Sequence, residues 1–211
     1  MLTADSLLAG YAHGIFPMAA SADDDELLWF DPDPRGILPL GRLHASRSLI
    51  RELRRGDWSA HHAVGHEFDH VVAQCAARPE TWINTPLRHL YRELHERRFA
   101  HALVIHREGR LAGGIFGVMM GGAYFGESMF STQTSGSRMA LLWLDLHLRN
   151  CGFRLFDTQY LTEHLASMGG VEIPRVQYHH LLAQALSRHP DIHAAPPPSR
   201  QVLLQEITQT S

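Results

Sequence analysis

Residues 100–130 constrain the fold more than any other segment, because they read as a series of strands, AHALVIHREGRLAGGIFGVMMGGAYFGESMF. Apolar and β-branched residues dominate the segment. REGR at residues 107–110 supplies one hairpin turn, and the glycine pair at residues 121–122 supplies a second. The pattern therefore predicts antiparallel strands joined by two tight turns.

Helical patterns and one further strand surround this series. We expect a strand at residues 153–159 and helices at the following residues: 67–79, 81–99, 137–150, 162–168 and 176–188. Helix, helix, antiparallel strands, helix, strand, helix is the order of an N-acetyltransferase-like (GNAT-like) α/β domain with a mixed, largely antiparallel sheet. The tail HAAPPPSRQ, residues 193–201, is broken by prolines, and we expect it to be peripheral.

The N-terminal part of the chain has a different texture. A short helix is expected within residues 2–14, with Thr3 as its N-cap and Gly14 as its stop. An acidic loop follows, and then an extended segment at residues 27–40 that contains two prolines after aspartates. We therefore predict a small, mixed N-terminal domain over residues 1–58 and the GNAT-like domain over residues 59–211.

The charged residues are unevenly distributed. Nineteen basic residues, all arginine, stand against 22 acidic residues, and the net charge of −3 argues against a protein that coats nucleic acid without selectivity. Four arginines recur at helical spacing in one short segment and form a stripe: Arg47, Arg51, Arg54 and Arg55. The stripe is compatible with a solvated helix face and with a phosphate-contact patch.

Other bulk features exclude several classes of protein. No apolar run approaches the roughly 20 residues of a membrane helix, and the first residues lack the basic region of a secretory signal. Cys75 and Cys151 are far apart and form no CxxC pair, so we expect neither a disulfide framework nor a cysteine zinc site. A soluble protein of the reducing cytoplasm is expected, and no feature requires an oligomer, so a monomer is expected as well.

Three polar residues stand out in or beside the predicted strands. Strand alternation places Asp157 and Gln159 on one face, with Thr158 opposite, and the pair could also cap the following helix. Glu127 follows Gly126 in an apolar strand, where burial of a carboxylate requires a cation. The pattern therefore indicates either a structural arginine or a cationic ligand beside Glu127.

Motifs for other chemistries are weak or missing. The loop and helix start at residues 131–142 could bind an anion or simply cap the helix, but they lack the Q/R-x-x-G-x-G/A pattern of an acetyl-CoA site. His62, His66 and His70 are spaced four apart, as on one helix face, yet no H-E-x-x-H pattern accompanies them, so no metal site is expected. No G-x-S-x-G motif indicates a serine nucleophile.

Eight motifs in order make the chain resemble the leucyl/phenylalanyl-tRNA-protein transferases, from about residue 3 to residue 180. They are YAHGIFPM, WFDPDPRGILPL, LHASRSLIRELRRG, TWIN, LAGGIFGV, FGESMFS, DTQYLTEHLASMGG and EIPRVQY. The resemblance implies transfer of leucine, phenylalanine or, less readily, methionine from tRNA to the N-terminal arginine or lysine of a protein, which marks that protein for degradation by the N-degron route. It also implies no acetyl-CoA and no other cofactor.

The resemblance implies roles for the three polar residues. The side-chain carbonyl of Gln159 would accept a hydrogen bond from the attacking amine, and Asp157 would polarise Gln159 or receive the proton through it. The charges of Glu127 and Asp157 would attract the acceptor's N-terminal side chain.

The resemblance also implies residues for the two ends of the aminoacyl-tRNA. The aminoacyl side chain would be held by Ile115, Tyr124, Met129, Phe156, Leu144 and Leu148, although an ordinary core role fits the last two equally well. Met18 and His106 stand where many family members carry the tryptophans that hold the terminal adenine, and the arginine stripe would contact tRNA phosphates. A small-molecule N-acyltransferase of the same fold and a non-catalytic tRNA or N-degron binding module remain as alternatives.

Overall fold

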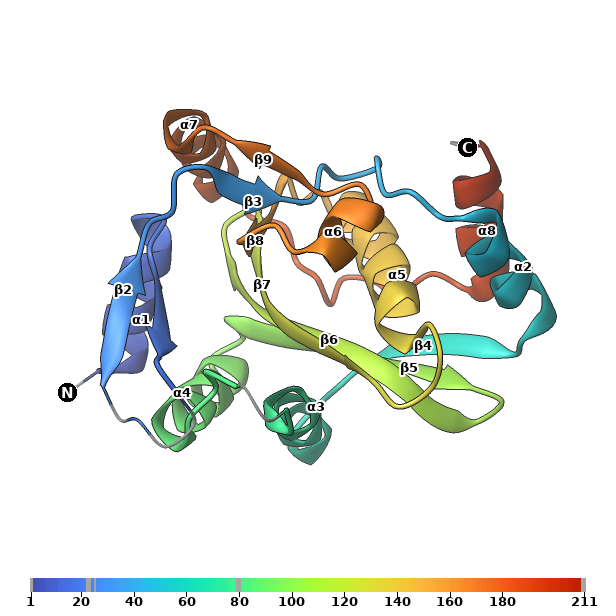
Figure 1. The fold of residues 1–211 in the computed structure, drawn as a ribbon, viewed down its shortest axis with the longest axis horizontal. Coiled ribbons are helices and arrows are strands. Elements are labelled where there is room, and N and C mark those ends of the chain that lie inside the picture. The colour runs from blue at the N-terminus through green and yellow to red at the C-terminus, as the bar shows by residue number, and fades with distance from the viewer. Residues whose placement is uncertain (1, 22–23, 25, 79–80, 210–211) are drawn as a thin grey trace.

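The computed structural model describes residues 2–21, 24, 26–78 and 81–209. Within these residues a seven-stranded sheet forms the centre of the molecule and helices cover both of its faces (Figure 1). The elements are α1 (Ala4–Ala12), β1 (Phe16–Ala19), β2 (Leu27–Phe30), β3 (Arg35–Ile37), α2 (Arg47–Arg55), β4 (Trp58–His62), α3 (His66–Ala76), α4 (Thr85–Glu96), β5 (Ala100–Arg107), β6 (Arg110–Met120), β7 (Ala123–Ser131), α5 (Gly136–Cys151), β8 (Leu155–Gln159), α6 (Glu163–Ser167), β9 (Val171–Ile173), α7 (Arg175–Leu186) and α8 (Arg200–Gln209).

The strand order of the large sheet is β4-β5-β6-β7-β8-β3-β9. Neighbouring strands are antiparallel except β7 and β8, which are parallel. Both predicted hairpins are confirmed: Glu108 and Gly109 have φ angles of 52° and 70° in the first turn, and Gly121 has a φ of 53° in the second. The prediction of a mixed, largely antiparallel sheet in an α/β fold is thereby confirmed.

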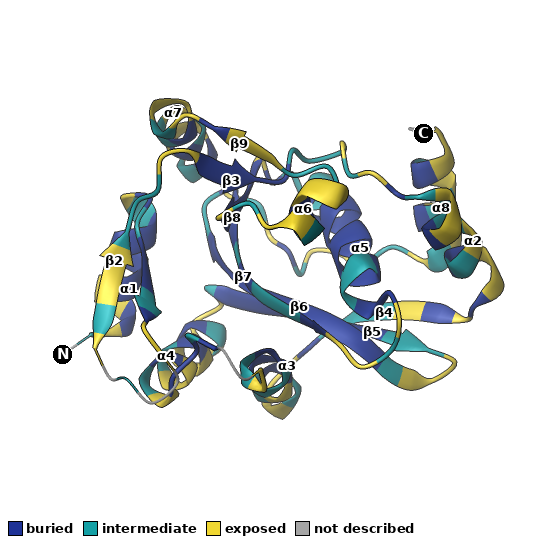
Figure 2. Cartoon of the chain, viewed as in Figure 1, coloured by how far each residue is buried: buried dark blue, intermediate teal, exposed yellow. Residues whose placement is uncertain are grey.

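Alternation along β5 divides the core into two layers. Ala102 and Val104 face a cluster that includes residues of α1, α3, α4 and α7, whereas Leu103 and Ile105 face a cluster that includes residues of α2, α5 and α8. The central strands and α5 are therefore the most buried part of the molecule (Figure 2).

The first part of the chain is joined closely to the large sheet. Thr3 caps α1 as predicted, and β1 and β2 form a separate two-stranded sheet. β3, however, inserts between β8 and β9, so that Gly36 pairs with both Gln159 and Glu172. The domain boundary near residue 58 stays a prediction.

One local expectation was wrong. His62, His66 and His70 do not share a helix face, because His62 ends β4 and Gly65, with a φ of 56°, turns the chain before α3 begins at His66. Residues 193–201 are exposed or half-buried, as expected. The structure adds α8 after the prolines, a helix that the sequence pattern did not predict, and it buries Leu203 against the core. Among the described residues, no helix is long and apolar enough to cross a membrane.

Candidate active site at the ends of β7 and β8

A cavity of about 440 Å³ opens where the parallel strands β7 and β8 separate. Their pairing extends only to Phe125 and Asp157, and beyond this point the two strands diverge. The wall is formed by the following residues: Met18, Arg78, Trp82, Ile115, Gly126, Glu127, Ser128, Met129, Ser137, Leu141, Phe156, Thr158, Gln159, Tyr160, Thr162, His164 and Leu165. It combines an apolar side with a few polar side chains, as in small-molecule sites.

Glu127 lies at an irregularity in β7. Phe116 of β6 pairs with Ser128 and Gly117 pairs with Gly126, which leaves Glu127 as an extra residue on the β7 side. Such bulges change the direction of a side chain relative to the regular strand. The carboxyl group, in a residue only 7% exposed, consequently reaches the cavity wall.

Three hydrogen bonds hold the Glu127 carboxylate. Tyr11 donates its hydroxyl to Oε1 at 2.7 Å, Tyr91 donates to Oε2 at 2.7 Å, and the Gln159 side-chain amide donates to Oε1 at 3.1 Å. Burial raises the pKa of Glu127 to about 7, the nearby charge of Asp157 adds to the rise, and the hydrogen bonds oppose it. The carboxyl group can therefore exchange a proton near neutral pH.

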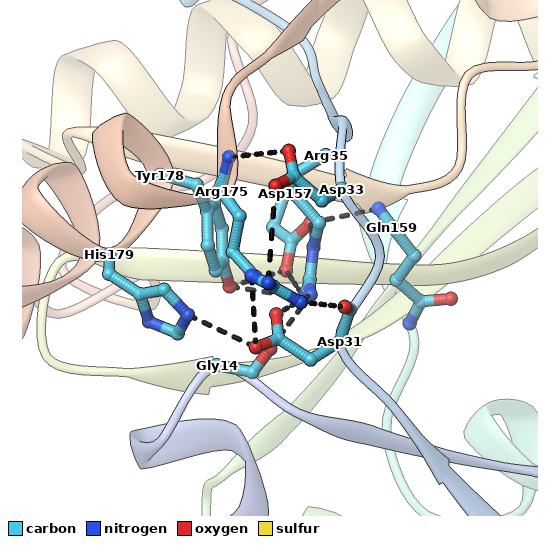
Figure 3. Close-up of polar contacts among 9 residues, drawn as sticks. All are labelled: Gly14, Asp31, Asp33, Arg35, Asp157, Gln159, Arg175, Tyr178 and His179. Atoms are coloured by element: carbon cyan, nitrogen blue, oxygen red, sulfur yellow. Dashed lines mark hydrogen bonds and ion pairs between the residues drawn. The ribbon is translucent and has the colours of Figure 1, made fainter.

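Asp157 lies behind the cavity wall rather than on it. Its side chain is fully buried and accepts two hydrogen bonds from Arg35, at 2.9 Å and 2.6 Å. The Tyr178 hydroxyl and the Gln159 backbone N–H also donate to it, each at 2.8 Å. Figure 3 shows the Gln159 backbone nitrogen joined to Asp157 while the Gln159 side chain points away from this cluster.

The expectation that Asp157 and Gln159 share one face was wrong. Gln159 has a φ of 66°, which breaks the strand alternation and sends its side chain to Glu127, while Thr158 also reaches the cavity wall. The capping alternative was wrong as well, because Thr162 supplies the side-chain cap of α6. The hydrogen-bond partners found for Glu127 within the described residues are two tyrosines and Gln159, not the structural arginine that we had considered.

The six residues expected around the aminoacyl side chain separate into two groups. Ile115, Met129 and Phe156 line the cavity. Three others are fully buried in the core: Tyr124, Leu144 and Leu148. Leu141, near the start of α5, lies on the cavity wall instead of Leu144 and Leu148, which follow it one and two turns further along the helix.

Only one of the two positions expected to hold the terminal base is at the cavity. Met18 lies on its wall, but His106 stacks on His61 in the neighbouring strand, with ring centroids 5.1 Å apart. Trp82 lines the cavity instead. Trp82 was not among the expected site residues, although the TWIN motif that carries it contributes to the resemblance.

The arginine stripe is exposed, as both of its interpretations require, and it lies outside the cavity wall. α2 packs beside α8, on the opposite side of the molecule from α1 in Figure 1. A short chain of contacts links α2 to the start of α5, because Ser135 donates to Glu52 at 2.7 Å and Arg138 donates to Ser135 at 2.9 Å.

No group of three or more histidine, cysteine or acidic side chains in the described part of the chain is arranged to hold a metal ion. Fold and site together define an α/β protein with a partly apolar cavity, in which a carboxamide and a carboxyl group contact each other. The cavity therefore offers an apolar surface and hydrogen-bonding groups side by side.

Comparison with known proteins gives the family. The model of the leucyl/phenylalanyl-tRNA protein transferase family matches residues 37–183, and the model of its N-terminal domain matches residues 1–33. Leucyl/phenylalanyl-tRNA–protein transferases of Paracoccus denitrificans and Dinoroseobacter shibae are 53% and 51% identical to this chain, over 100% and 93% of it and over 98% and 87% of their own lengths. That of a Ruegeria species is 50% identical over 100% of the chain and 99% of its own length. The chain belongs to the leucyl/phenylalanyl-tRNA–protein transferase family.

Proposed function

We propose that this protein transfers leucine or phenylalanine, and less readily methionine, from aminoacyl-tRNA to the N-terminal arginine or lysine of acceptor proteins, creating an N-degron. The observation that carries the proposal is the contact between Gln159 and Glu127 on the wall of a cavity with an apolar side. The cavity is large enough for an aminoacyl group, and the polar pair provides hydrogen-bonding groups for an amine.

The donor's side chain occupies the apolar part of the cavity. Ile115, Met129 and Phe156 provide that surface, with Leu141 and Leu165 beside them. Trp82 and Met18 offer an aromatic and an apolar surface on which the terminal base of the tRNA can stack. This arrangement replaces the expected role of His106, which lies away from the cavity.

The reaction itself requires alignment more than activation, because the aminoacyl ester is already reactive. The acceptor's amine attacks the ester carbonyl, a C–N bond forms, the bond from the carbonyl carbon to the ribose oxygen breaks, and the proton lost by the amine ends on that oxygen. Alignment alone can lower the barrier by roughly 7–11 kcal/mol. Gln159 accepts a hydrogen bond from the amine through its side-chain carbonyl, and its amide N–H bond to Glu127 increases the electron density on that oxygen.

Glu127 also selects the acceptor. Its ionised carboxylate attracts a cationic side chain at the acceptor's first position, which favours arginine or lysine over neutral residues. The exposed arginines of α2, by contrast, contact tRNA phosphates, and their contribution falls as salt rises.

The remaining assignments are also proposals. The order of β4 to β7, α5 and β8, with β7 and β8 parallel and separating at the cavity, supports a GNAT-like domain. The monomeric state expected from the sequence stays a proposal. Free Cys75 and Cys151, together with a tRNA substrate, support a cytoplasmic location.

A peptide-transfer assay tests the proposal. Charged tRNA carrying labelled leucine or phenylalanine is mixed with peptides that begin with arginine, lysine or alanine. We expect label on the first two peptides and none on the third. Labelling of all three would contradict the acceptor assignment, and labelling of none, with charged tRNA still bound, would favour a binding module.

A further inference from the structure

Arg35 is a fully buried cation that no part of the proposed reaction yet uses. Its guanidinium donates to Asp157 twice, to the Gly14 carbonyl at 2.7 Å and to the Tyr178 hydroxyl at 3.1 Å. The guanidinium carbon also lies over the rings of Phe16 and Tyr178, 4.8 Å and 4.2 Å from their centroids. It thus joins the turn after α1, β1, β8 and α7. Figure 3 shows its contacts with Gly14, Asp157 and Tyr178, together with a longer ion pair to Asp31.

Both carboxylate oxygens of Asp157 are occupied by hydrogen bonds within the protein, so neither is open to a substrate. Its Oδ1 accepts from Arg35 and from the Gln159 backbone N–H, and its Oδ2 accepts from Arg35 and Tyr178. Paired bonds of this kind fix both the position and the plane of a carboxylate. Asp157 also contributes no atom to the cavity wall.

What Asp157 does contact is the backbone of Gln159. Gln159 has a φ of 66°, a left-handed conformation that is unfavourable for residues other than glycine unless the surroundings hold it. The bond from its N–H to Asp157 Oδ1 supplies such a hold. Because of this conformation, the Gln159 side chain leaves the strand toward Glu127 and the cavity.

We propose that Arg35 is a positioning residue for the transfer reaction: it fixes Asp157, which in turn fixes the left-handed backbone of Gln159 and directs the carboxamide to Glu127. Asp157 then acts through the Gln159 backbone and not as a proton acceptor. The inference rests on the proposed function for its kinetic consequence, but the geometry that it assigns can be measured without turnover.

Two substitutions and their combination separate positioning from proton transfer. Asp157→Asn keeps an oxygen for the Gln159 N–H but opposes the Arg35 fork, and Arg35→Met leaves the Asp157 carboxylate buried without its cation. We expect each substitution to lower kcat by about 10- to 100-fold with little change in KM for aminoacyl-tRNA. Small displacements of an aligning group act on the chemical step. In the double variant the asparagine can hold Gln159 without the opposed charge, so we expect at least about a tenfold recovery over the worse single variant.

The double variant discriminates between the two roles of Asp157. If its rate is no higher than that of Asp157→Asn alone, the carboxylate itself takes part in the chemistry and the proposal is overturned. Arg35→Lys is the second variant, because it keeps the charge but cannot make two parallel bonds; full kcat in that variant would also contradict the proposal. Arg97→Met is the control, since Arg97 forms an ion pair of 2.6 Å with Asp5 on the surface, and we expect it to leave kcat unchanged.

Hydrogen exchange at the Gln159 backbone amide provides the readout that does not depend on activity. We expect slow exchange in the wild type and in the double variant, and exchange at least about tenfold faster in Arg35→Lys, because local opening releases the amide to solvent. Equal exchange in the wild type and Arg35→Lys would overturn the positioning role. If the wild type transfers no amino acid, the proposed function fails, and the exchange rates still decide the role of Arg35.

Discussion

Glu127 combines deep burial with three hydrogen-bond donors. A carboxylate in such a place is stabilised by its donors and destabilised by the loss of water, and here the second effect is larger, so its pKa rises to about 7. Because the hydroxyls of Tyr11 and Tyr91 are the short partners, the charge is delocalised over polar groups and not neutralised by an arginine. In the proposed function, a cationic acceptor would therefore not have to break an internal ion pair at Glu127.

This raised pKa has a consequence for stability. The folded protein binds the Glu127 proton more tightly than the unfolded chain, so stability contributed by the protonated carboxyl group declines as pH rises from about 4.5 to 7. The decline amounts to on the order of 3 kcal/mol. We expect Glu127→Gln to remove this component, so that the variant gains stability relative to the wild type between pH 5 and pH 8.

Urea unfolding at the two pH values measures this difference. Glu172→Gln, at an exposed strand position, serves as the control. Parallel pH profiles for the wild type and Glu127→Gln would show that the carboxyl group keeps an ordinary pKa.

The identity of the site residues could be read from the sequence more easily than their geometry. Glu127 and Gln159 stood out as polar residues in apolar strands, and the structure brings them together. The separation of Asp157 from Gln159 could not be predicted, because it depends on a left-handed residue that an alternating pattern does not reveal. Likewise, nothing in the local pattern of His106 indicates that β5 carries it away from the cavity.

At the scale of elements, α5 is positioned by close contact with β6. A Cβ added to Gly136 would overlap the carbonyl oxygen of Ala112 and lie 3.1 Å from the Gly113 Cα. These are backbone atoms, so no side-chain rotation can relieve the overlap. The helix start that carries Ser137 and Leu141 to the cavity therefore depends on a glycine.

We expect Gly136→Ala to lower the free energy of unfolding by about 2–3 kcal/mol, as overpacking does in a tight core. Gly109→Ala is the matched control, because its Cβ would meet no atom within 4 Å and only its φ of 70° is unfavourable. Chemical denaturation of both variants measures the difference. An equal loss in the two variants would mean that α5 can move away from β6 without penalty.

The last helix shows a second limit of local patterns. Three prolines break residues 193–201, and the sequence pattern predicts no helix beyond residues 176–188. In the structure Leu203 is fully buried beside α2 and α5. Contacts so distant in sequence are not encoded in the periodicity of the segment itself.

Truncation of Leu203 tests whether α8 belongs to the folded core. We expect Leu203→Ala to destabilise the protein by about 2–5 kcal/mol, the range for a buried leucine. Val202→Ala, at a neighbouring side chain that is 41% exposed, should change stability far less. Similar unfolding free energies for the two variants would indicate that α8 contributes little to the core.

At the scale of the whole molecule, the hairpins of β5 to β7 could be predicted because neighbouring residues form them. The position of β3 could not be predicted in this way. Arg35 of β3 pairs with Ile173, far along the chain, and β3 lies between two strands, β8 and β9, that follow it in sequence. The site depends on this long-range insertion. The N-terminal segment supplies Tyr11, Met18 and Arg35, and α4 supplies Tyr91. Glu127 and Gln159 come from the second half of the chain.

A group of histidines joins β4, β5 and α5 to the segment before α8. His62 contacts His101 at 2.8 Å, His62 and His147 bond the carbonyls of Ala195 and Ile192, and the ring of His193 lies against His62. Burial lowers the pKa of all four side chains. The folded protein therefore binds these protons less tightly than the unfolded chain, and the stability of the neutral cluster is lost as pH falls below about 6.5.

We expect the free energy of unfolding to fall between pH 6.5 and pH 5 less steeply in His101→Leu than in the wild type. His66→Leu is the control, since His66 is exposed at the start of α3. Thermal unfolding across this pH range provides the measurement. Equal slopes in His101→Leu and the wild type would exclude the cluster as the source of acid sensitivity.

Single-turnover transfer of phenylalanine from bound aminoacyl-tRNA to a peptide that begins with arginine tests the role of the Gln159–Glu127 pair. The wild type is compared with Gln159→Ala under conditions in which both bind the charged tRNA. We predict transfer by the wild type and a rate at least about 100-fold lower in the variant, because the amine loses its aligning partner. Equal rates would contradict the assignment of the Gln159–Glu127 pair as the site of peptide-bond formation.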